Sequence, residues 1–161
     1  MEKILLRKPT SEDLPALIPL WIGESDFHHE LDPEYYTPTA SDEDKQFEKY
    51  FLDALATNDP YFLIAEMEEK VVGFVMYKKG KADYFDTNIV DFGEVLELFV
   101  DPDFRKKGIG EKLVNEVEKF FKEEGLAYLK LEASSRNDNA IKFYQEHGFE
   151  DHVTVMYKKI S

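Results

Sequence analysis

The sequence predicts a single α/β or α+β domain with a mixed sheet. Apolar segments typical of strands and amphipathic segments typical of helices follow the order strand, two helices, strands, helix, strand, helix, strand. No internal repeat, low-complexity tract or linker divides the chain, so residues 1–161 are expected to form one domain. This length is sufficient for a substantial hydrophobic core.

The N-terminal third predicts one strand and two helices. The strand covers residues 3–7, and the first helix covers residues 13–22, where Leu14, Leu17, Ile18 and Trp21 share a face. Pro15 suits the first turn of that helix, whereas Pro19 should disturb it. A second helix begins at residues 41–44 and carries an apolar stripe of Phe47, Tyr50, Phe51, Ala54 and Leu55.

The rest of the chain supplies the sheet and two more helices. Residues 61–66 and 71–77 predict a hairpin that turns at residues 68–70, and a polar loop over 78–91 leads to a strand over 94–100. A helix over 108–124 ends at Gly125, and a strand over 126–133 follows it. After a final helix, residues 153–158 are expected to close the sheet as its last strand.

Composition excludes several classes of function. The 34 acidic and 20 basic residues give a net charge of -14, which argues against a nucleic-acid partner and would attract cationic substrates, although it also serves solubility. With no cysteine there is no disulfide, thiolate metal site or acyl-cysteine intermediate. No apolar stretch reaches transmembrane length, and the residues from Met1 to Ile4 carry no secretory signal pattern. We therefore expect a cytoplasmic protein without a membrane partner.

The most informative motif runs from Val100 to Gly110 and reads V-D-P-D-F-R-K-K-G-I-G. A strand feeds a turn that contains proline, and a basic, glycine-bearing run then opens a long amphipathic segment. Glycines allow close approach of the backbone to a ligand, and the free N–H groups of a helix start attract phosphate. The candidate pyrophosphate cradle comprises Arg105, Lys106, Lys107, Gly108, Ile109 and Gly110.

Two common phosphate loops do not fit this motif. The nucleoside-triphosphate loop G-x-x-x-x-G-K-[ST] is absent, and a dinucleotide fingerprint would need a third glycine within Glu111-Lys112-Leu113. The remaining pattern, [RQ]-x-x-G-x-[GA] after a strand that ends in Val-Asp-Pro, resembles the coenzyme A loop of the GCN5-related N-acetyltransferase (GNAT) superfamily. A second stretch, from Asn137 to Phe149, resembles that superfamily's signature N-x-x-A-x-x-F-Y-x-x-x-G-F.

The resemblance implies a mostly antiparallel sheet in which two central parallel strands splay apart to admit acetyl-CoA. Backbone groups of Leu98, Phe99 and Val100 would then run beside the pantetheine arm, and one N–H would hold the acetyl oxygen. Tyr144 matches the motif tyrosine, for which the resemblance implies a general-acid role at the CoA sulfur. Asn137 matches the motif asparagine and would bond the cofactor's arm, cap its helix, or do both.

Glu97 is the expected base or amine-binding carboxylate, and Glu94 is its rival. Strand alternation places Glu97 on one face with Val95 and Phe99, but a bulge would reverse this assignment. The alternative for either carboxylate is a solvated position at the sheet edge.

The acceptor site is expected around residues 25–36, because the resemblance implies that the loop between the first two helices forms one wall of it. Phe27, His29 and Tyr35 are the candidate substrate-binding residues there, together with Glu97. The neighbouring histidines do not have the spacing of a metal site, so no metal is expected.

These observations predict an acetyl-CoA-dependent N-acetyltransferase that moves an acetyl group to a primary amine by direct attack in a ternary complex. The acceptor would be a small-molecule or peptide amine, and superfamily habit also raises a homodimer. Two alternatives stay open: an acyltransferase for another acyl-CoA, with Phe99 or Phe149 setting the acyl pocket, and a non-catalytic CoA-binding sensor.

Overall fold

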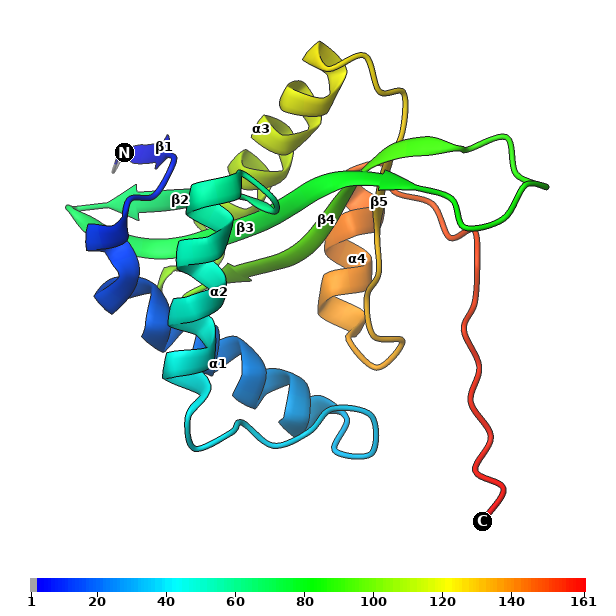
Figure 1. The fold of residues 1–161 in the computed structure, drawn as a ribbon, viewed down its shortest axis with the longest axis horizontal. Coiled ribbons are helices and arrows are strands. Elements are labelled where there is room, and N and C mark those ends of the chain that lie inside the picture. The colour runs from blue at the N-terminus through cyan, green and yellow to red at the C-terminus, as the bar shows by residue number, and fades with distance from the viewer. Residues whose placement is uncertain (1–2) are drawn as a thin grey trace.

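Five strands form one sheet in the order β1-β2-β3-β4-β5 (Figure 1). The structure is a computed structural model that describes residues 3–161, so Met1 and Glu2, part of the segment inspected for a signal, lie outside the described residues. The strands are β1 (Ile4–Arg7), β2 (Tyr61–Met67), β3 (Lys70–Lys81), β4 (Asp91–Val100) and β5 (Leu129–Leu131). Neighbours from β1 to β4 pair antiparallel, while β4 and β5 pair parallel. The mixed sheet predicted from the sequence is confirmed.

The hairpin between β2 and β3 turns where the sequence predicts it. Glu68 and Glu69 adopt φ angles of 51° and 62°, the left-handed values of the two-residue turn that suits the twist of a hairpin. Beyond the hairpin, the predicted loop over residues 78–91 is too long. Residues 78–81 pair with residues 91–94, because the ladder between β3 and β4 continues to Lys81 and Asp91.

Four α-helices cover the sheet: α1 (Leu14–Leu31), α2 (Glu43–Thr57), α3 (Ile109–Glu123) and α4 (Asp138–Glu146). Short 3₁₀ turns, Ser11–Asp13 and Pro102–Phe104, precede α1 and follow β4. The first helix extends nine residues beyond the predicted end at residue 22. Pro19 lies inside α1 with an exposed side chain, while Leu17, Leu20 and Glu24 are buried, so packing of the inward face outweighs the helix-breaking effect of proline.

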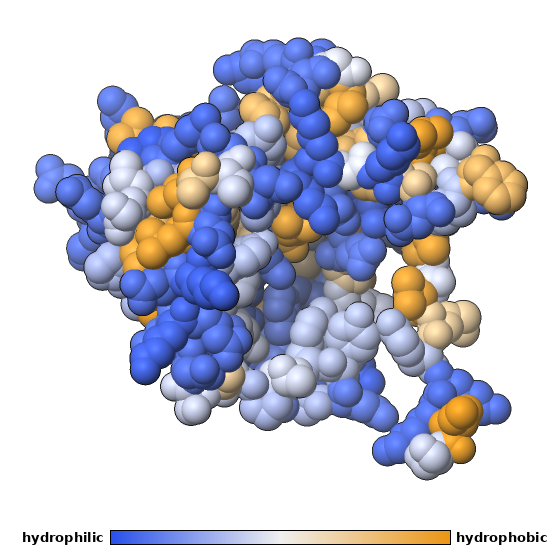
Figure 2. Space-filling model, in the orientation of Figure 1, coloured by the Kyte–Doolittle hydropathy of each residue, from blue (hydrophilic) through white to orange (hydrophobic). Residues whose placement is uncertain are grey.

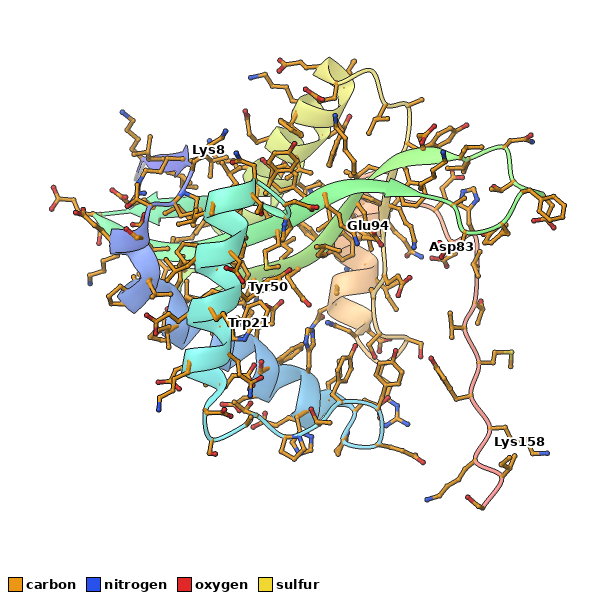
Figure 3. The ribbon with its side chains drawn as sticks, in the orientation of Figure 1. Lys8, Trp21, Tyr50, Asp83, Glu94 and Lys158 are labelled. Atoms are coloured by element: carbon orange, nitrogen blue, oxygen red, sulfur yellow. The ribbon has the colours of Figure 1, made fainter. Side chains whose placement is uncertain are left out.

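Two hydrophobic clusters lie on opposite faces of the sheet. One packs α3 against the sheet through residues that include Leu113, Val117 and Phe121. The other packs α1 and α2 against the opposite face, and there Trp21 stacks on Phe47 with ring centroids 4.6 Å apart. Tyr50 of α2 lies beside Trp21, as Figure 3 shows. Packing against α2 and the sheet therefore fixes the half of α1 that carries Trp21.

The predicted last strand over residues 153–158 is wrong. Residues 150–161 have no regular secondary structure and run away from the sheet in Figure 1. Val153 and Tyr157 are 75% and 77% exposed. The alternating apolar pattern is present, but the tail does not pair with β5, which forms only three residues of the strand predicted over 126–133.

Arg7 ties the first strand to the turn that starts α1. Its guanidinium donates to both carboxylate oxygens of Asp13 at 2.7 and 2.8 Å and to Glu66 at 3.0 Å. These bonds lower the pKa of Asp13 to about 2. The backbone N–H of Thr10 also donates to Asp13, so one carboxylate caps the turn and binds the strand.

Asp13→Asn is expected to lower the free energy of unfolding at neutral pH by about 1.5–3 kcal/mol, the usual value of charge-assisted hydrogen bonds. Because the folded-state pKa of Asp13 lies below its ordinary value, this stabilisation is complete above the ordinary pKa and is lost as pH falls towards about 2. Urea denaturation at several pH values measures the effect, with the exposed Asp53→Asn as the control. A difference between Asp13→Asn and wild type that stayed constant down to the lowest pH would contradict this assignment.

Candidate active site

A bulge in β4 sets the orientation of the candidate base. Met76 of β3 pairs with Glu97 and Tyr77 pairs with Val95, so Leu96 has no partner in the register. Val95 consequently packs in the α3 cluster, whereas Leu96 and Phe99 pack in the α1–α2 cluster. The predicted grouping of Glu97 with both Val95 and Phe99 is therefore only half right. The extra residue turns Glu97 to the face covered by α1.

The same strand has an open edge beyond the bulge. Parallel pairing with β5 covers only residues 93–95, opposite residues 129–131. Leu98, Phe99 and Val100 lie past the last paired residue, so their backbone groups on that side are not used by β5. A chain-like ligand could extend along this edge and accept main-chain hydrogen bonds.

The basic loop joins this open edge to the N-terminus of α3. Lys106 and Gly108 adopt φ angles of 61° and 78°, and Gly108 is the residue that precedes the helix. Left-handed backbone next to a helix start directs successive N–H groups to one concave side, which is the geometry of an anion site. Ile109 is buried beneath the loop and anchors it.

The side chain of Arg105 connects the basic loop to β4 and α1. Its Nε donates to the carbonyl oxygen of Val100 at 2.9 Å, and its guanidinium carbon lies 6.0 Å from the ring centre of Phe27 and 5.5 Å from that of Phe99. Arg105, Phe27 and Phe99 border a pocket of about 340 Å³ between α1 and the turn after β4. Lys107 lies with its ammonium 5.3 Å from the ring centre of Phe104.

The two sequence motifs meet at Gly110. A Cβ at this position would lie 3.3 Å from the tip of the Phe143 ring, so the start of α3 and the face of α4 are in close contact. Asn137 caps α4 by accepting a hydrogen bond from the backbone N–H of Ala140 at 3.1 Å. The capping role considered for Asn137 is thus present in the structure. The contact between Gly110 and Phe143 keeps Tyr144, the residue after Phe143, close to the end of the basic loop.

Glu97 lies in a cluster with Glu24 and His28. A carboxylate oxygen of each glutamate and a ring nitrogen of His28 lie within 4.8 Å of one another. Glu24 is only 6% exposed, and its carboxyl group lies close to that of Glu97. Burial and the charge of Glu97 raise the pKa of Glu24 well above its ordinary value. Glu24 and His28 are not among the residues predicted for the site, because the predicted helix ends at residue 22. Once α1 is extended, their spacing of four residues places them on one helical face.

Tyr144 of α4 is near enough to the same cluster for its charges to act on the phenol. Burial, followed by the negative charges of Glu24 and Glu97, raises the pKa of its phenol well above the ordinary value. The hydroxyl therefore stays protonated across the neutral range and can donate a proton. Figure 2 shows the surface hollowed between α2 and α4, the side of the sheet on which these elements converge.

The other predicted acceptor residues take different positions. Phe27 lies beneath Arg105, and the His29 ring nitrogen Nδ1 is 2.9 Å from the carbonyl oxygen of Tyr36 in the turn after α1. Tyr35 is exposed and contacts Tyr157 of the C-terminal tail, with ring centroids 5.6 Å apart. Of the residues predicted for the acceptor site, Glu97 alone is in the carboxyl cluster.

Glu94, the rival of Glu97, is bound by lysines. Its carboxylate oxygens lie 3.4 Å from Lys130 and 3.9 Å from Lys78. Figure 3 shows Glu94 apart from Trp21 and Tyr50, the residues on the α1–α2 side of the sheet. The geometry favours Glu97 over Glu94 as the candidate reactive carboxylate.

No helix within residues 3–161 combines the length and the apolar character needed to cross a membrane.

Comparison with known protein sequences gives matches to acetyltransferases. The sequence profile described as "Acetyltransferase (GNAT) family" matches residues 25–149. An uncharacterized N-acetyltransferase of Methanocaldococcus jannaschii is 30% identical over 150 residues, which cover 93% of this chain and 62% of the relative. A spermidine N(1)-acetyltransferase of Thermoplasma acidophilum is 30% identical over 91 residues, covering 56% of this chain and 51% of the relative. The chain thus spans less than two thirds of the length of either relative.

The fold also matches solved structures. A predicted acetyltransferase of Clostridium acetobutylicum, solved with acetyl-CoA, superposes with a TM-score of 0.70 at 21% identity. The match covers 98% of this chain and 96% of that one. At this level of identity the likeness shows the shared fold.

Glu24→Gln is expected to stabilise the folded protein increasingly as pH rises. A carboxyl whose folded-state pKa lies above its unfolded value costs no stability while it is protonated in both states. The destabilisation by Glu24 begins above its unfolded-state pKa and is complete above its folded-state pKa. Glutamine does not ionise, so the variant lacks this destabilisation. The melting temperature of the variant should therefore equal that of wild type in acid and exceed it at alkaline pH.

The matched control is Glu30→Gln, which removes an exposed carboxylate from the same helix. It should leave the pH dependence of the melting temperature unchanged. Parallel curves for wild type and Glu24→Gln would show that Glu24 is not held in a cluster that resists its ionisation.

Proposed function

The chain belongs to the acetyltransferase (GNAT) family, and from that premise we propose that it transfers the acetyl group of acetyl-CoA directly to a primary amine. The observation that carries the proposal is the convergence of Glu97 and Tyr144 beside the open edge of β4. A proton acceptor and a proton donor thus flank the place where a thioester bound along that edge would react. The relatives named as N-acetyltransferases support the amine as acceptor.

The residues present fit acetyl-CoA. The left-handed backbone at Lys106 and Gly108 forms a concave N-terminus at α3 that suits a diphosphate. Leu98, Phe99 and Val100 supply the unpaired edge that suits the amide-bearing pantetheine arm. When bound, acetyl-CoA supplies the activated acetyl group. The likeness to a structure solved with acetyl-CoA supports the same assignment.

The proposed chemistry needs no nucleophile from the protein, in agreement with the absence of cysteine. Glu97 accepts a proton from the incoming ammonium group, whose electron pair then forms the new bond to the acetyl carbon. A backbone N–H of the 98–100 edge donates to the acetyl oxygen as negative charge develops there, a contribution on the order of 3 kcal/mol for such donors. Tyr144 donates its proton to the departing sulfur, and the second proton lost by the attacking nitrogen restores the phenol.

We propose acetyl as the natural acyl group and a small-molecule or peptide amine as the acceptor. A larger acyl group would have to be accommodated beside Phe99, which is 7% exposed and already contacts Arg105. A non-catalytic CoA sensor would have no use for a phenol held near two carboxyls. The proposal also includes a cytoplasmic location and activity without a metal ion.

CoA is expected to bind at least about tenfold more tightly than pantetheine, which lacks the diphosphate. One charge-assisted hydrogen bond contributes roughly 1.5–3 kcal/mol, and the loop offers several donors. Isothermal titration calorimetry with both compounds measures the difference, and raising the salt concentration should weaken CoA binding more. Equal affinities would remove the loop from the cofactor site, and no binding of either compound would remove the proposed function.

Tyr144→Phe should retain CoA affinity and lower turnover by at least roughly tenfold, the lower part of the range for general acids. Release of free thiol from acetyl-CoA, followed with a panel of primary amines, measures turnover. Tyr128→Phe, at a half-exposed position outside the cluster, is the control and should match wild type. Unchanged turnover in Tyr144→Phe would exclude the phenol as the proton donor.

A further inference from the structure

Glu24 has no role in the chemistry described so far, although it is the charged residue in closest association with the candidate base. It lies on α1, is only 6% exposed, and has a carboxylate oxygen within 4.8 Å of one from Glu97 of β4. Two negative charges this close in a buried place repel strongly, and burial together with the charge of Glu97 raises the pKa of Glu24 well above its ordinary value. The pair therefore favours one proton for two carboxyl groups.

Titratable groups from several elements surround the pair. They are His28 of α1, Tyr36 of the following turn, Tyr50 of α2 and Tyr144 of α4. Burial, and after it neighbouring negative charge that includes Glu97, raises the pKa of each of the three phenols, so all three are neutral near neutral pH. The burial of Glu24 and the repulsion between the two carboxyls therefore oppose a second negative charge on the pair.

We propose that Glu24 and Glu97 share one proton and together form the binding and deprotonation site for an acceptor that arrives as an alkylammonium ion. The inference rests on the proposed acetyl transfer and adds a positioning residue and a substrate class to it. Glu24 acts through Glu97: the proton on Glu24 keeps the pair at a single negative charge and stabilises the Glu97 carboxylate, so Glu97 stays ionised and able to accept a proton at lower pH than it would alone.

The proton balance is closed by the pair. Before the reaction the pair carries one proton and a single negative charge, which attracts the ammonium group. Breaking one N–H bond leaves its electron pair on nitrogen and places a second proton on the pair, which becomes neutral. The neutral amine then attacks the acetyl carbon, and the pair returns one proton to solvent after the products leave. The net reaction releases one proton for each ammonium ion acetylated.

The first test is the pH profile of kcat/KM for an alkylamine acceptor with wild type, Glu24→Gln and Glu24→Asp. Loss of the second carboxyl should move the acidic limb of the profile to higher pH by about one unit or more, since the proton of Glu24 would no longer stabilise the Glu97 carboxylate. Glu24→Asp should restore the wild-type limb at least in part. A purely structural role for Glu24 would lower kcat without moving the limb, and that result would overturn the inference.

The second test does not depend on turnover. Infrared spectroscopy of wild type near neutral pH should show a protonated carboxyl C=O band that is lost in both Glu24→Gln and Glu97→Gln and retained in Glu94→Gln. Absence of the band from wild type would also overturn the inference. If the wild-type protein acetylates no amine while the band is present, the proposed function fails but the shared proton stands.

Discussion

The extra residue in β4 is the constraint on which the candidate site depends. A regular strand would keep Glu97 on the face of Val95 and hold β4 in register with both neighbours. Leu96 interrupts that regularity, so Glu97 turns towards α1 while the strand parts from β5 after residue 95. Local loss of ladder pairing thus produces both the orientation of the candidate carboxylate and the open edge beside it. The rest of the sheet, packed by hydrophobic clusters on both faces, keeps this irregular segment in place.

The second determinant is the placement of α1. Its N-terminal half is fixed by Arg7 and Asp13 at one end and by the contacts of Trp21 with α2. Its C-terminal half extends past Pro19 and carries Glu24 and His28 under the sheet. A buried carboxyl beside another carboxyl lowers stability, and the protein retains this arrangement within an otherwise well-packed core. Such a cost is typical of a site maintained for chemistry.

The sequence predicted the fold because its strongest signals are local. The hairpin of β2 and β3, the helix after Gly108 and the cap at Asn137 each follow from turn and helix chemistry within a few residues. The phosphate-type loop and Tyr144 belong to the same class, because their motifs are contiguous. The extension of α1 could not be predicted in this way, since the intrinsic cost of Pro19 is offset by long-range burial of Leu17 and Leu20. The alternation of Val153, Val155 and Tyr157 misled for the opposite reason: a strand pattern forms a strand only where another strand pairs with it. The pairing of Glu24 with Glu97, 73 positions apart, required the register shift at Leu96, which no local pattern encodes.

The close approach of Gly110 to Phe143 has a mechanical consequence. The helix that begins at the cofactor loop and the helix that carries the phenol meet at a point where even one added methyl group would be tight. Any displacement of the loop backbone on binding a diphosphate would therefore press directly on α4, one residue away from Tyr144. Occupancy of the loop by a diphosphate and the position of the Tyr144 phenol would therefore change together.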